Sequence, residues 1–155
     1  MSERAIIRHT VATVAYRGGK TLRDVPPAFA HFAGTGKTPL QILAHIGDLF
    51  DWALRMAQGD KTWHDSQPLE WEQEKQRFFT SLEAFDALLA SEEPVHVPLE
   101  KLFQGPIADA LTHVGQLAML RRLAECPMKG ENYFVAQIEP GRVGPEQAKA
   151  AREFD

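Results

Sequence analysis

The sequence has little cysteine and no long hydrophobic run. Cys126 is the single cysteine among 155 residues, so an internal disulfide framework is excluded. Charged residues interrupt every apolar stretch well before the roughly 18 residues that a membrane-spanning helix needs. The first eight residues, MSERAIIR, contain neither the apolar centre nor the cleavage motif of a secretory signal. These absences favour a reducing, cytoplasmic setting and no membrane partner.

An excess of one charge sign is also missing. The net charge is −4 and the isoelectric point is about 5.9. No basic block and no basic stripe with interleaved aromatic residues occurs, so a nucleic-acid partner is not expected. Hydrophobic residues make up 44% of the chain and charged residues 25%, which is ordinary for a globular protein with one core. Without repeats or linker-like tracts, residues 1–155 are expected to form a single domain.

Helical periodicity is the main structural signal. Four segments place apolar residues at spacings of three and four, and none shows the alternation of a strand. Thr38, Pro39 and Gln41 form a capping box with proline at the first helical position, while Gly18-Gly19 is expected to end the first helix. We therefore predict an all-α, four-helix bundle with long connections and a short C-terminal helix. The long helices are predicted at residues 2–17, 38–58, 68–90 and 104–125, and the short one at residues 145–154.

One motif is misleading. The letters GTGKT, at residues 34–38, resemble the end of a phosphate-binding P-loop. That motif needs an earlier glycine where this chain has His31, and it needs a buried strand before the loop. The preceding letters VPPAFAHFA do not have the pattern of a buried strand, so nucleotide binding is not expected here.

The residues that most clearly suggest a chemical role lie in the predicted helices at residues 38–58 and 104–125. Asp109 and His113 are four residues apart, so one helical turn places a carboxylate and an imidazole on the same face. This spacing suits two ligands of one metal ion, but it also suits a simple side-chain pair on a solvated face. His45 is the best third ligand, although a histidine in an apolar row can also be a core residue. Asp48, one turn further on, could orient His45 as a hydrogen-bond acceptor.

Three stretches resemble a known family. The letters TPLQILAHIGDLFDW, DALTHVGQLAMLRRLAECP and ENYF are similar to the DinB-like superfamily of DinB/YfiT-like metalloenzymes, over roughly residues 38–144. Members are four-helix bundles with a metal-binding triad. The resemblance implies that His45 and His113 correspond to two of its ligands. Asp109 stands where the family usually has a third histidine, and a carboxylate is still a competent ligand.

The resemblance also implies a function. It suggests a divalent metal ion, with zinc or nickel expected, and S-transferase chemistry on a small-molecule substrate such as a low-molecular-weight thiol. It further implies a homodimer, which the exposed-looking aromatic residues Trp63 and Phe79 would also suit. No protein general base is identifiable; Trp52, Gln116 and Arg121 are candidate pocket residues whose alternatives are purely structural.

Two other readings of the site follow from the ligand types. A non-catalytic binding or stress-response bundle, with a structural or empty metal site, is the main alternative to an enzyme. Two histidines and one carboxylate would also suit a non-haem iron oxygenase, but only the ligand types point to that chemistry.

Overall fold

The fold is built from helices joined by loops. A computed structural model describes residues 1–154. Within that range the only extended pairing is an isolated bridge between Glu131 and Glu153, so the predicted all-α class is confirmed. In chain order the elements are α1 (Glu3–Leu22), η1 (Pro27–His31), α2 (Pro39–Ala57), α3 (Trp71–Ala90), α4 (Leu99–Leu102), η2 (Phe103–Ile107), α5 (Ala108–Leu123) and η3 (Tyr133–Val135).

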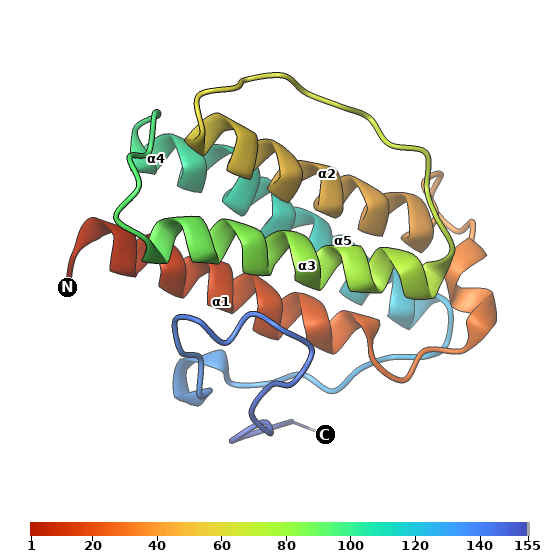
Figure 1. Cartoon of the computed structure of the whole chain (residues 1–155). Helices are drawn as coiled ribbons and strands as arrows, with labels where there is room; N and C mark the ends of the chain where they lie inside the picture. Colours follow the sequence, from red (N-terminus) through yellow and green to blue (C-terminus); the bar gives the residue numbers. More distant parts are fainter. Residues whose placement is uncertain (155) are drawn as a thin grey trace.

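The four long helices form a bundle in which α2 packs on α3 and α5, and α1 packs on the same two helices. Figure 1 shows that α2 and α3 run in the same direction, while α1 and α5 run in the opposite one. The connection between α2 and α3 therefore has to return along the whole length of the bundle. This arrangement differs from a simple alternation of directions, and it places α2 and α5 as antiparallel neighbours.

Local sequence signals explain the start of α2 well. The Thr38 hydroxyl accepts a hydrogen bond from the Gln41 backbone N–H at 3.2 Å, and the Gln41 side chain accepts one from the Thr38 N–H at 2.9 Å. This is the predicted capping box, and it satisfies amides that the helix itself cannot pair. The helix is thereby fixed in register from its first turn.

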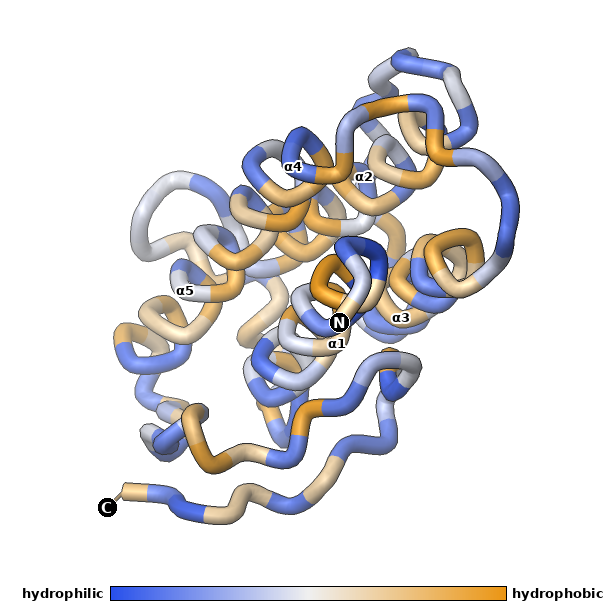
Figure 2. The backbone as a smooth tube through the Cα atoms, turned by 90° about the vertical axis from the view of Figure 1, so that its left-hand side faces the viewer, coloured by the Kyte–Doolittle hydropathy of each residue, from blue (hydrophilic) through white to orange (hydrophobic). Residues whose placement is uncertain are grey.

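The apolar faces of the four helices meet in one core. Hydrophobic positions gather toward the middle of the bundle in Figure 2. In the predicted helix at residues 104–125, most of the apolar residues spaced by three and four are buried, and Leu111 and Ala118 are partly buried. The buried ones are Ile107, Ala110, Val114, Leu117 and Leu120.

The predicted end of the first helix at Gly18-Gly19 is wrong, because α1 continues to Leu22. Gly18 is buried against α3, where an added Cβ atom would lie 2.6 Å from Cζ of Phe78. The two glycines therefore allow α1 and α3 to approach closely instead of ending the helix. Tertiary packing outweighs the low helix propensity of glycine here.

The last long helix also begins differently from the prediction. It is preceded by α4 and by a π-helical turn, η2, that contains Gly105 and Pro106. Proline has no N–H to donate to the preceding turn, and a wider turn accommodates this loss without ending the helix. Regular α-helix resumes at Ala108, one residue before Asp109.

The predicted C-terminal helix at residues 145–154 does not form. Only its end, residues 152–154, pairs with residues 130–132, with Asn132 N–H donating to Arg152 O at 3.0 Å and Phe154 N–H donating to Gly130 O at 2.8 Å. An isolated helix of about ten residues is marginal in water. The pairing at residues 152–154 fixes the end of the segment in a non-helical backbone.

The C-terminal segment after α5 runs beside α1 (Figure 1), and buried polar side chains join the two. Glu131 accepts hydrogen bonds from the Tyr16 hydroxyl and from the Lys20 ammonium, the latter at 2.9 Å. Tyr133 packs edge-on against Tyr16 and so helps to hold this segment, whereas the neighbouring Phe134 is 96% exposed and makes no such contact. Burial, and then the bond to Glu131, raises the pKa of the Tyr16 phenol.

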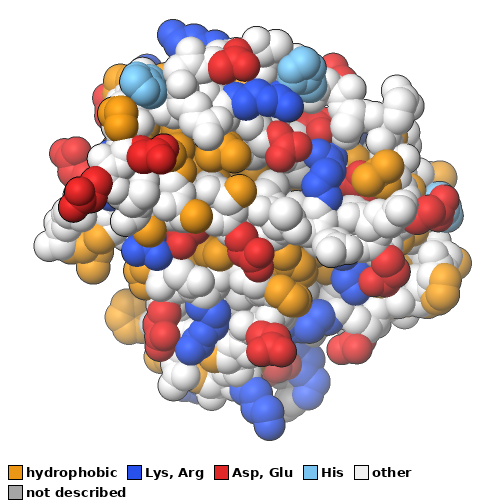
Figure 3. All heavy atoms as spheres, in the orientation of Figure 1, with side chains coloured by type: hydrophobic (Ala, Val, Ile, Leu, Met, Phe, Trp, Pro, Cys, Tyr) orange, Lys and Arg blue, Asp and Glu red, His pale blue; other side chains and the backbone are white. Residues whose placement is uncertain are grey.

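The surface carries both charge signs. On the face shown in Figure 3, acidic and basic side chains are interspersed. Within residues 1–154, no helix combines the length and the apolar character needed to cross a bilayer.

The aromatic residues that suggested a dimer pack against other parts of the same chain. Phe79 is only 9% exposed and packs against Phe78, and the partly buried Trp63 packs edge-on against Trp52. The dimer prediction therefore loses this support.

Candidate metal centre

Helix α5 carries Asp109 and His113 on the face that looks toward α2. The Nε2 atom of His113 lies 3.5 Å from Oδ1 of Asp109, as the spacing of one helical turn predicts. Asp109 is the second residue of α5, two positions after the π-helical turn η2 ends at Ile107, so it lies in the first turn of regular α-helix.

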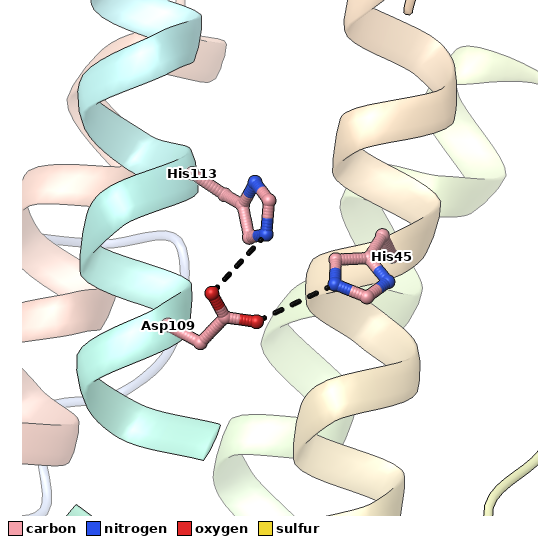
Figure 4. A group of neighbouring side chains, drawn as sticks. All are labelled: His45, Asp109 and His113. Carbon is pink, nitrogen blue, oxygen red and sulfur yellow. Dashed lines mark ion pairs between the residues drawn. The ribbon is translucent and has the colours of Figure 1, made fainter. Parts of the chain in front are cut away.

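Helix α2 supplies the third side chain. Nε2 of His45 lies 3.5 Å from Oδ2 of Asp109, and the three side chains point toward one another across the α2–α5 interface (Figure 4). One ligand atom from each residue lies within 4.8 Å of the other two. The structure thus brings together the three residues singled out in the sequence, from helices far apart in the chain, and they could hold a metal ion.

The separations suit an ion between the side chains. Bonds of about 2.1 Å in a tetrahedral site place neighbouring ligand atoms about 3.4 Å apart. Each of the two 3.5 Å separations ends on a different oxygen of Asp109, so they describe a carboxylate that offers one oxygen to each imidazole. Each separation is close to the tetrahedral value and longer than a good hydrogen bond. Three protein ligands would leave a fourth position open, and the Asp109 side chain, 46% exposed, places the site at the surface.

Gln116 completes the surroundings of His113. Its Oε1 atom lies 2.7 Å from Nδ1 of His113. With its oxygen toward the ring the Gln116 amide can only accept, which favours the tautomer protonated at Nδ1 and leaves the Nε2 lone pair toward Asp109. The sequence identified Gln116 only as a candidate pocket residue, and its position one turn after His113 explains the contact.

An aromatic pair covers one side of His45. The Trp63 ring centroid lies 5.6 Å from that of His45, and the Trp52 ring packs edge-on against the Trp63 ring. Trp52 thus reaches the site only through Trp63. Sequence reasoning did not place Trp63 here, because it lies in an irregular connection. The one signal that could have found it is a large aromatic residue among polar neighbours.

Asp48 does not orient His45. Its carboxylate is buried and pairs with Arg77 of α3 at 2.9 Å, while its second oxygen accepts from the Ser66 N–H at 3.0 Å. Arg77 also donates to the Ser66 hydroxyl and to Ala44 O. Asp48 and Arg77 therefore hold the long α2–α3 connection against the bundle.

Arg121 is also structural. Its guanidinium is buried and donates to the backbone carbonyls of Lys20, Thr21 and Arg23 at the end of α1. It further donates to Cys126 O at 2.8 Å. The carbonyls at a helix end lack partners within the helix, so Arg121 satisfies them and fixes the turn after α5. This is the helix-terminal role that was the alternative to a pocket role.

The chain matches no protein-family model, and no curated protein and no solved structure is significantly similar to it. The likeness to the DinB-like superfamily therefore stays a prediction carried by the sequence motifs.

Proposed function

We propose that the chain is a metal-dependent enzyme whose divalent ion is held by His45, Asp109 and His113. The observation that carries this proposal is the convergence of two imidazoles and one carboxylate from two helices at ligand-like separations. Three protein ligands and an open position are typical of catalytic rather than structural metal sites. Zinc and nickel are the ions we propose, since both accept imidazole and carboxylate ligands.

The substrate we propose is a low-molecular-weight thiol, in an S-transferase reaction with an electrophilic second substrate. A divalent ion at an open site lowers the pKa of a group that coordinates it, which for a thiol yields a good nucleophile. In such a reaction the thiol gives its proton to solvent, and its sulfur forms a bond to the electrophilic carbon of the second substrate. The bond from that carbon to its leaving group breaks, and the leaving group departs with the bonding electrons.

The protein side chains have distinct roles in this proposal. His45 and His113 offer neutral nitrogen ligands, and Asp109 offsets one unit of the ion's charge. Gln116 fixes the tautomer of His113, which is a positioning role. Trp63 shields one face of His45 from water.

The test combines metal content with turnover. The purified wild-type protein should retain close to one zinc or nickel ion per chain, and removal of the ion should abolish consumption of a thiol and an electrophile. His113→Ala should lose the ion, since two remaining ligands hold it poorly. His9→Ala, at an exposed histidine of α1, is the matched control and should keep it.

The alternative is a binding bundle without turnover. Its support is that Asp109 faces both imidazoles, so the carboxylate can pair with a protonated histidine when no ion is present. Wild-type protein that holds no ion and whose stability ignores chelators would favour this alternative.

A further inference from the structure

A pocket of about 370 Å³ lies between α2 and α5. This volume is within the range of pockets that hold small molecules. Both helices that bear the metal ligands contribute to it, together with the segment that precedes α2. Its lining residues are Thr35, Lys37, Ile42, Gln116, Met119 and Leu120.

The pocket adjoins the metal centre. Gln116 lines it and also contacts His113 at 2.7 Å. Ile42 lies three residues before His45, on the same side of α2. Because α2 and α5 are antiparallel, a step backward along α2 and a step forward along α5 lead in the same direction (Figure 1). The pocket therefore continues from the metal centre toward the beginning of α2.

The lining is apolar in its middle and cationic at its far end. Ile42, Met119 and Leu120 form the apolar part, and Met119 remains 50% exposed although it is a large hydrophobic residue. Lys37 brings the only formal charge among the lining residues. Leu120 is seven residues beyond His113, so the pocket extends about 10 Å from the ligand-bearing turn.

We propose that this pocket binds an organic anion with an apolar chain about 10 Å long. Its anionic group, a carboxylate, phosphate or sulfonate, faces Lys37, and its chain lies on Ile42 and Met119. Its other end reaches the metal centre, a part of the inference that rests on the proposed function. A divalent ion beside one carboxylate leaves a net positive charge there, so both ends of the site favour an anion.

This assignment gives a role to the GTGKT segment. Thr35 and Lys37 belong to it, and both line the pocket although no nucleotide-binding loop is formed. The segment would contribute its lysine as a single charge that selects the end group of the ligand.

The test uses mercaptooctanoate as the probe, with mercaptooctanol as the uncharged comparison. Binding to the zinc-loaded protein is followed through the methyl resonances of Met119 and Ile42. Both probes should move these resonances, and mercaptooctanoate should bind about fivefold more tightly, the size of an exposed ion pair. Lys37→Gln should remove that preference. Lys101→Gln, at an exposed lysine of α4 outside the pocket, should preserve it.

Plain octanoate and metal-free protein separate this inference from the proposed function. If zinc does not bind but octanoate still moves Met119 in a way that depends on Lys37, the pocket stands and the proposed function fails. If zinc binds but no probe moves the Met119 and Ile42 resonances, the pocket inference is overturned by itself. A preference for mercaptooctanoate that survives Lys37→Gln would also overturn it.

Discussion

The close approach of α1 and α3 makes Gly18→Ala an informative perturbation. Gly18 is buried, and a Cβ atom there would lie 2.6 Å from Cζ of Phe78 and 3.4 Å from Cγ2 of Val114. Phe78 is itself only 1% exposed, so its ring has little space in which to move away. The added methyl group must therefore separate the helices or force a side chain from its preferred rotamer.

The magnitude follows from two opposing effects. Overpacking a core by one methyl group costs about 1–3 kcal/mol of unfolding free energy. Replacing glycine by alanine inside a helix contributes about 1 kcal/mol in the opposite direction. Because the contact is far shorter than van der Waals separation and involves a buried ring, we expect the upper part of the first range. Gly18→Ala should then destabilise the protein by about 1–2 kcal/mol net.

Gly115→Ala provides the matched control. Gly115 lies in the middle of α5, and nothing lies within 4 Å of the position of its added Cβ atom. The same chemical change there should stabilise the protein by roughly 0.5–1 kcal/mol. Urea unfolding followed by circular dichroism should show the two variants on opposite sides of the wild type. Equal shifts of the same sign would refute the reasoning.

Three further outcomes follow from the contacts around the site and the tail. Gln116→Ala should weaken metal affinity about tenfold, measured by competition with a chromogenic chelator, because His113 loses the partner that fixes its tautomer; unchanged affinity would exclude that role. Asp109→His should keep or strengthen zinc binding, whereas Asp109→Ala should lose it, and equal zinc content in the two variants would contradict a ligand role for this position. Because the folded-state pKa of Tyr16 is raised, its contribution to stability is complete below the ordinary tyrosine pKa of about 10 and is lost as the pH rises above it. Urea unfolding of Tyr16→Phe should therefore show a shallower decline of stability above that pH than the wild type, and parallel curves would argue against the effect.

The features of this fold that depend only on neighbouring residues in the chain were predicted from the sequence. The capping box of Thr38 and Gln41 and the apolar stripe of α5 need only neighbouring residues, and both were predicted correctly. Asp109 and His113 share a face because of helix geometry alone. His45 needed more, since only the packing of α2 against α5 brings it to them. The sequence suggested His45 through its place in a helical, mostly apolar segment, and the resemblance to a family supported that choice.

The wrong predictions share a cause, which is tertiary contact. Gly18 reads locally as a helix end, but the ring of Phe78 on another helix requires a glycine. Residues 145–154 have helical propensity, but their last three residues pair with residues 130–132 instead. Asp48 was one turn from His45, yet its partner Arg77 lies 29 residues further along the chain. None of these contacts has a signature at short range in the sequence.

The proposal as a whole depends on His45, Asp109 and His113 holding one divalent ion together. X-ray absorption spectroscopy of the zinc-loaded wild-type protein can observe these ligands. We expect two imidazole nitrogens and a carboxylate oxygen at about 2.0–2.2 Å, with a fourth light ligand from solvent. His45→Ala and His113→Ala should each remove one imidazole contribution or the ion itself. A spectrum with no imidazole contribution, or one that either variant leaves unchanged, would contradict the claim.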